Sequence, residues 1–356
     1  MSEIIHSGSG AKRDYGLDLL KVLASLGIFF LHYQQVFDVY FENHINFFKG
    51  FYTWGYLVEL FFIISGFLIY KDIDRIYRAE LTLDKWMAPR LVRLLPLLAV
   101  SVLVYQMADA LHVKLIGETF FIEKDFSIFR TVVAGLGLQA GGIFKRGYIN
   151  NPTWYISVLL ICYVLFYVLT SASRKIGCKP YYLYALMIFI GIWLRDNHIE
   201  ISETARGLYS VFFGVLLAHY IKLWGVKRRE ILLSIFVLAL TGAILIFKPE
   251  TDVIDMNFAS TFFVFPALIM LAEAPVVKER LNFPFLKSWS EVSYNLYIWH
   301  MPFFVVVSIV HYLTNAAFSY GKLSTMYICL AICLAGAVFS HYIIEKNLNR
   351  IFQIKK

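Results

Sequence analysis

Titratable and polar side chains recur at helical spacing along one apolar run, GLDLLKVLASLGIFFLHY; they are Asp18, Lys21, Ser25 and His32. At about 100° per residue of an α-helix, these side chains share one narrow face. Polar groups are costly in hydrocarbon, so an imidazole on such a stripe indicates acid–base chemistry. The alternative for His32 is a structural ring bonded to a backbone carbonyl. For Lys21 it is a snorkelling anchor paired with Asp18.

A single carboxylate, Glu59, stands in the second apolar run, YLVELFFIISGFLIY. Because this run crosses in the opposite direction to the first, Glu59 should reach a depth comparable with that of His32. A carboxylate there would orient the ring and stabilise its protonated form. We therefore expect His32 to be held by Glu59 or by a polar neighbour on another helix. Gly66 shares the helical face of Glu59 and would permit close approach of another helix.

Two later runs carry further polar groups at helical spacing. Arg90 and Arg93 lie on one face at the start of WMAPRLVRLLPLL, which suits a phosphate clamp, with simple cytoplasmic anchoring as the alternative. Ser293, Tyr297 and His300 share one face of WSEVSYNLYIWHMPFF. Entering from the cytoplasm, this helix would place His300 about 15 Å deep, near the bilayer centre.

Aromatic residues follow the long outer loop 111–152 and could stack on a sugar. They are Trp154 and Tyr155, and Tyr297 would join them in binding the acceptor. An ordinary interfacial aromatic belt is the alternative for Trp154.

The elements that carry these residues are apolar stretches long enough to cross a bilayer. They lie near 17–38, 50–70, 89–110, 153–172, 181–194, 206–222, 231–247, 258–274, 291–313 and 323–345. The sequence therefore predicts an all-α polytopic membrane protein of about ten transmembrane helices forming one domain, residues 1–356. The short loops SRKIGCK and KLWGVKRRE are basic, whereas the loops RDNHIEISE and KPETDVID on the other side of the membrane are not. Both termini are therefore expected in the cytoplasm. A crossing near 128–144 would break this alternation, so a re-entrant or surface segment is predicted there.

Composition supports a lipid environment. Of 356 residues, 59% are hydrophobic and 16% are charged, against about half and about a quarter in soluble domains. This excludes a soluble enzyme, and the abundant aromatic residues exclude a disordered chain. The net charge of +8 is spread between apolar runs, which argues for membrane topology rather than nucleic-acid binding. The four cysteines lie in apolar runs, so neither a disulfide framework nor a metal site is expected.

The ordered set of motifs resembles the acyltransferase family 3 membrane proteins. The matching blocks are LDLLKVLASLGIFFLHY, VELFFIISGFLIY, APRLVRLLP, WYISVLLICYVLFY and VSYNLYIWHMP, with IIEK closing the chain. The resemblance implies a protein that moves acyl groups, usually acetyl, from coenzyme A onto carbohydrates of the cell envelope. It implies that His32 is the catalytic histidine and that Arg90 and Arg93 bind the coenzyme A end. It also implies that Ser293 and His300 belong to the site.

Three positions depart from the family pattern. Lys21 stands where an arginine is usual, which keeps the charge but loses the planar fork. Tyr155 follows the tryptophan of the fourth block, where many members have glutamate. Asn347 stands where a proline commonly follows the closing glutamate. The second departure is consistent with a different acceptor.

Together these features predict a membrane O-acyltransferase of the bacterial cytoplasmic membrane. Acetyl-CoA is the expected donor, gripped by Lys21, Arg90 and Arg93, with His32 as general base or as a transient acyl carrier. A carbohydrate or lipid-linked sugar is the expected acceptor, membrane lipids are expected partners, and a homodimer is an open option. The alternative function is a proton-coupled transporter or flippase of an envelope glycolipid, with His32, Glu59 and His300 as a proton relay.

Overall fold

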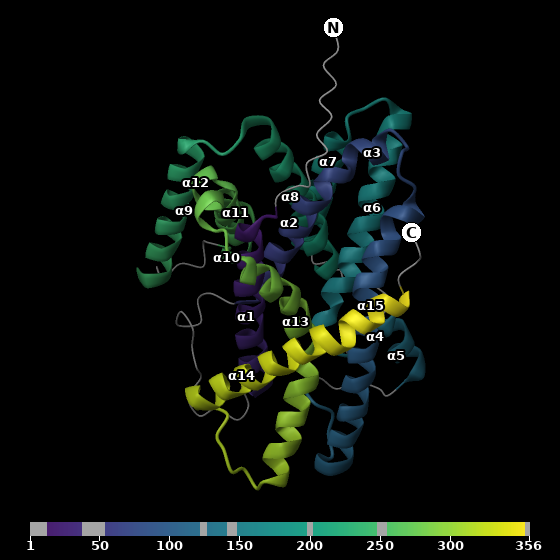
Figure 1. The fold of residues 1–356 in the computed structure, drawn as a ribbon, viewed down its shortest axis with the longest axis vertical. Helices are drawn as coiled ribbons and strands as arrows, with labels where there is room; N and C mark the ends of the chain where they lie inside the picture. The colour runs from purple at the N-terminus through teal and green to yellow at the C-terminus, as the bar shows by residue number, and fades with distance from the viewer. Residues whose placement is uncertain are drawn as a thin grey trace.

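The computed structural model describes residues 13–37, 54–121, 127–140, 148–197, 202–247 and 255–352, and every regular element in these ranges is helical (Figure 1). The α-helices are α1 (Tyr15–Phe37), α2 (Leu57–Ile69), α3 (Ile73–Tyr77), α4 (Leu83–Ile116), α5 (Ile128–Gly135), α6 (Trp154–Ile176), α7 (Pro180–Asp196), α8 (Ser202–Trp224), α9 (Arg228–Phe247), α10 (Met256–Ala259), α11 (Phe265–Glu273), α12 (Pro275–Arg280), α13 (Pro284–Leu313), α14 (Leu323–Phe339) and α15 (Lys346–Phe352). Two π-helical segments, Ser260–Val264 and Ser340–Glu345, continue α10 into α11 and α14 into α15.

Eight helical stretches of the described chain are long and apolar enough to cross a membrane, and they coincide with eight of the ten predicted spans. The all-α polytopic architecture is confirmed. The other two predicted spans, near 50–70 and 181–194, form α2 with 13 residues and α7 with 17 residues. Helix α7 is shorter than the twenty or so residues of a typical crossing. Helix α2 is continued on both sides, by the 3₁₀ turns Trp54–Tyr56 and Tyr70–Asp72 and then by α3.

The segment predicted to avoid crossing begins with the short helix α5, which packs on α4. Eight residues of helix rise only about 12 Å, so α5 cannot span hydrocarbon. Ile128 is 86% exposed and Phe129 is 66% exposed, whereas Ala134, Gln139 and Ala140 are at most 2% exposed. The segment therefore begins at the protein surface, and its later described residues lie against the rest of the protein. Residues 141–147 of the predicted segment lie outside the described residues.

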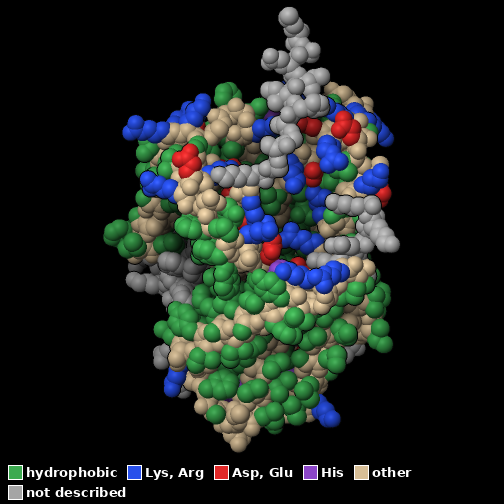
Figure 2. Space-filling model, in the orientation of Figure 1, with side chains coloured by type: hydrophobic (Ala, Val, Ile, Leu, Met, Phe, Trp, Pro, Cys, Tyr) green, Lys and Arg blue, Asp and Glu red, His purple; other side chains and the backbone are tan. Residues whose placement is uncertain are grey.

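Charged side chains gather toward one end of the molecule. Figure 1 places α3, α12, the α6–α7 junction and the α8–α9 junction at its upper end. In the same orientation, Lys and Arg side chains concentrate in the upper half of the visible face, and hydrophobic side chains dominate the lower half (Figure 2). The four loops that the charge pattern assigns to the cytoplasm therefore share one end of the bundle.

Helix α13 is the centre of the packing that positions the predicted site residues, because it contacts α1, α4 and α14. Helix α2 packs instead on α8, and glycines make their backbones meet. A Cβ added at Gly66 would lie 1.9 Å from the Val211 carbonyl oxygen, and one at Gly214 would lie 2.1 Å from the Ile63 carbonyl oxygen. The close approach predicted at Gly66 is thus present, and it makes α8 the neighbour of Glu59.

Candidate active site

The polar stripe predicted on α1 faces the protein interior. Asp18 is 2% exposed, and its carboxylate accepts hydrogen bonds from Arg13 Nε (2.6 Å) and Ser290 Oγ (2.8 Å). It also pairs with Lys21, 3.4 Å away, as the sequence suggested. Ser25 turns its hydroxyl back to its own helix, at the Val22 carbonyl. The first turns of α1 are thereby held to α13 through Asp18.

Two histidines from different helices meet in the interior. His32 Nδ1 lies 2.8 Å from His300 Nε2, and the two rings stack with centroids 4.9 Å apart. His300 is 1% exposed and its Nδ1 lies 3.2 Å from the Leu296 carbonyl oxygen. His32 is 8% exposed, so both rings are buried and His32 is the less enclosed of the two.

The hydrogen-bond partners fix the protons of the neutral pair. A carbonyl oxygen only accepts, so His300 carries its proton on Nδ1 and presents Nε2 as an acceptor. His32 must then donate from Nδ1 to His300. This leaves an unshared electron pair on His32 Nε2, which has no hydrogen-bond partner among the described residues. The arrangement presents a neutral base, oriented by a second ring, as in the nucleophile–base–orienter sets of known enzymes.

A cleft lies between α1, α2, α4, α6 and α13. Its lining includes the three cations predicted to bind coenzyme A, Lys21, Arg90 and Arg93. Ser293, Tyr297 and Tyr155, which the sequence assigned to the site, also line it.

The two arginines of α4 differ in how far their charges are engaged. Arg90 forms an ion pair with the buried Asp72 (2.9 Å), and its guanidinium lies 4.0 Å from the Trp86 ring. Within the described part of the chain, Arg93 has neither an ion pair nor a hydrogen bond. Arg93 is exposed and close to Lys21, which is itself paired with Asp18, so Arg93 is the cleft cation that is most available to an anion.

The deep end of the cleft leads toward the histidine pair. The rings of Tyr155 and Tyr297 lie 5.8 Å apart, and the Tyr297 ring lies 6.0 Å from the His300 ring. Tyr155 exchanges a hydrogen bond with Ser65 (3.1 Å), and Tyr297 donates to the Pro152 carbonyl. The histidines do not themselves line the cleft, so Tyr297 is the side chain that connects the two features.

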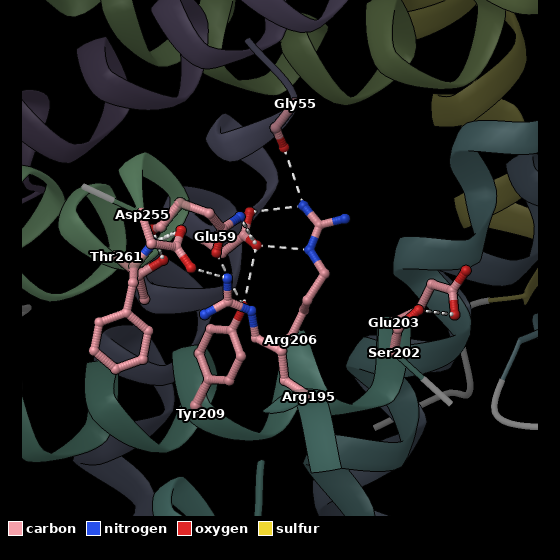
Figure 3. Close-up of polar contacts among 11 residues, drawn as sticks. Gly55, Glu59, Arg195, Ser202, Glu203, Arg206, Tyr209, Asp255 and Thr261 are labelled. Carbon is pink, nitrogen blue, oxygen red and sulfur yellow. Dashed lines mark hydrogen bonds and ion pairs between the residues drawn. The ribbon is translucent and has the colours of Figure 1, made fainter. Parts of the chain in front are cut away.

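The expectation that Glu59 orients His32 is wrong. Glu59 is fully buried and takes a bidentate ion pair from Arg206 of α8, at 2.6 Å to Oε1 and 2.8 Å to Oε2 (Figure 3). Asn257 also donates to Glu59 Oε1, at 2.9 Å, and Arg206 donates to the Gly55 carbonyl. A buried carboxylate is stabilised most by a fork of charge-assisted hydrogen bonds, and Arg206 supplies one that a single imidazole cannot.

Two other predicted residues lie differently from expectation. Trp154 is outside the lining of the cleft, with the Arg206 guanidinium 5.1 Å from its ring. Its sugar-binding role stays a prediction. Ser293 lines the cleft, but its hydroxyl donates to the Ser290 carbonyl of its own helix.

Sequence reasoning missed two ion-pair partners, Arg206 for Glu59 and Asp72 for Arg90. Arg206 stands at the first residue of a predicted span, where an arginine normally indicates only a membrane boundary. Asp72, the partner of Arg90, falls in a loop assigned to the cytoplasm. Gly66 and the glycines of α8 were the available signal, because small residues on two helices indicate that those helices meet.

Comparison with known families identifies the chain. The family model for the acyltransferase domain of acyltransferase family 3 matches residues 14–343, nearly the whole chain. The chain therefore belongs to this family and is a membrane acyltransferase. Neither the curated proteins nor the solved structures gave a match.

The Glu59–Arg206 pair predicts a stability effect. In Arg206→Met the buried Glu59 loses its counter-charge, and we expect a loss of about 3–5 kcal/mol of folding free energy. Removing both charges in Glu59→Leu/Arg206→Met should restore much of it. Thermal unfolding in detergent measures the difference. The control is Lys222→Met, which breaks an exposed pair with Asp74 and should melt as the wild type does. Equal melting of Arg206→Met and Lys222→Met would contradict the assignment.

Proposed function

We propose that the protein is an acyl-CoA-dependent O-acyltransferase of the bacterial cytoplasmic membrane. It would move an acetyl or other short acyl group to a hydroxyl of a cell-envelope carbohydrate. The observation that carries the proposal is the neutral His32–His300 pair behind a cleft whose lining includes Lys21, Arg90 and Arg93. Family membership supports acyl transfer, and the residues of this site support the donor and the reaction type.

The donor half of the proposal rests on Lys21 and Arg93. Coenzyme A carries several phosphate charges, and charge-assisted hydrogen bonds from such cations hold phosphate. Both residues lie near the ends of α1 and α4 that the charge pattern assigns to the cytoplasm, where acyl-CoA would enter. Ser65, Tyr155 and Tyr297 add polar groups deeper in the cleft, along which the acyl arm could extend toward the histidines.

In the proposed reaction, the acceptor hydroxyl gives its proton to His32 Nε2 as its oxygen attacks the thioester carbonyl. The carbon–sulfur bond then breaks and coenzyme A leaves as the thiol or thiolate. His300 accepts from His32 Nδ1 throughout, so it keeps the ring oriented and stabilises the imidazolium. A transient acyl group on His32 is equally compatible with these residues. Trapping labelled protein with acetyl-CoA in the absence of acceptor would separate the two routes.

The transporter alternative has lost one of its supports. It required Glu59 to exchange protons with His32 and His300, but Glu59 is held by Arg206 on another pair of helices.

Loss of the base should abolish transfer. We expect His32→Ala to lower the incorporation of labelled acetyl from acetyl-CoA into envelope glycan by about 10²–10⁴-fold, the usual range for a general base. His311→Ala, in the last turn of the same helix as His300, is the matched control and should keep wild-type activity. Full incorporation by a folded His32→Ala protein would refute the proposal, as would glycolipid transport by the wild type without acetyl consumption.

Substitution of Arg93 should weaken the binding of the acyl donor. In Arg93→Ala we expect the KM for acetyl-CoA to rise by about 10- to 100-fold, the value of a charge-assisted hydrogen bond, with little change in kcat. Arg174→Ala removes an exposed arginine at the end of α6 and should leave both constants unchanged. An unchanged KM in Arg93→Ala would show that this arginine is only a membrane anchor.

A further inference from the structure

Helix α13 has an interruption in its hydrogen bonding next to the histidine pair. Pro302 lies inside this helix and has no N–H, so it cannot donate to the carbonyl of Ile298, four residues earlier. Ile298 is fully buried, and a buried carbonyl without a donor costs free energy. His300 stands between these two residues. The turn that carries the histidine therefore depends on a donor from outside the helix.

Asn150 supplies that donor. Its side-chain Nδ2 donates to the Ile298 carbonyl oxygen at 3.1 Å and to Ser101 Oγ of α4 at 3.2 Å. The Ser101 hydroxyl donates to the Leu98 carbonyl, so it can accept from Asn150. Both neighbours of Asn150 Nδ2 are thus acceptors, and only the nitrogen end of the amide can face them.

The backbone around Asn150 is built to present this amide. Asn150 is fully buried and has a φ of 48°, a left-handed conformation that asparagine tolerates better than most residues. Thr153 donates to the Asn150 carbonyl through both its backbone nitrogen and its hydroxyl, and Gln139 donates to that hydroxyl. Two residues beyond Asn150, the Pro152 carbonyl accepts from Tyr297. This turn is therefore bonded to α13 at two consecutive residues, Tyr297 and Ile298.

We propose that Asn150 is a positioning residue for the acyl transfer. By closing the gap that Pro302 leaves in α13, it fixes the turn that holds His300, and through His300 the direction of His32 Nε2. It touches neither the reacting atoms nor the cleft lining. We call the hydrogen bonds from Asn150 Nδ2 to the Ile298 carbonyl and to Ser101 Oγ the Asn150 clamp. The kinetic effect of this clamp rests on the proposed function, but the clamp itself is a separate structural claim.

The test uses the full-length protein with substitutions at both ends of the clamp. Asn150→Ala removes the donor, and Asn150→Asp keeps the shape but presents only acceptors. We expect either variant to lower kcat about tenfold, as for an unsatisfied buried carbonyl, with KM for acetyl-CoA unchanged. Pro302→Ala restores the intrahelical donor, so Asn150→Ala/Pro302→Ala should recover most of kcat. The matched control is Asn197→Asp, because the Asn197 amide also donates to a helix carbonyl, that of Trp193, but on the surface.

A second measurement separates the clamp from the proposed function. The reaction of His300 with diethyl pyrocarbonate, followed by peptide mass spectrometry, reports its exposure without any substrate. We expect faster labelling in Asn150→Ala and a return to the wild-type rate in the double variant. If the wild type transfers no acetyl group, the proposed function fails and this labelling still decides the clamp. Wild-type kcat and labelling in Asn150→Ala would overturn the inference, as would recovery of melting temperature but not of kcat in the double variant.

Discussion

The structure depends on one hydrogen bond between two imidazoles buried among transmembrane helices. His32 and His300 come from α1 and α13. The Leu296 carbonyl fixes the proton position on His300, and His300 in turn fixes the proton position on His32. Outside water, a cationic histidine is expensive, whereas a neutral pair bonded to a backbone carbonyl satisfies its polar groups and keeps one free lone pair. The same burial keeps water away from the pair, which would protect the thioester of the proposed acyl donor from hydrolysis. Both the stability of the buried pair and its proposed chemistry therefore require that the two rings keep a fixed geometry.

The buried acidic residues Asp18, Asp72 and Glu59 pair with basic residues other than Arg93. Asp18 and Asp72 neutralise charge along the cleft, and Glu59 and Arg206 neutralise each other in a separate cluster. Arg93 is left with no partner within the described residues, beside Lys21. An exposed arginine costs little because its long stem lets the charged group reach the interface. Arg93, which has no partner within the described residues, is therefore well placed to bind a polyanionic substrate.

Much of this was predictable because helical periodicity and bilayer depth are properties of single segments. The alignment of Lys21 and His32 on one face, and the depth of His300, follow from the rise and twist of one helix each. Which helices pack against each other does not follow from the rise and twist of a single helix. Glu59 and Arg206 are 147 residues apart, and their pairing depends on the glycine-mediated contact of α2 with α8. Asn150 lies in a loop without periodicity, and only the missing N–H of Pro302 indicates that α13 needs a donor there.

The protonation of the histidine pair is the most direct test. Magic-angle-spinning NMR of protein with isotopically labelled histidine, assigned by comparison with His32→Gln and His300→Gln, reads the proton on each ring nitrogen. The account predicts neutral rings with the proton on Nδ1 in both, and a coupling from His32 Nδ1 across the hydrogen bond to His300 Nε2. A proton on His32 Nε2 in the resting protein would contradict it, because that nitrogen could not then act as the base.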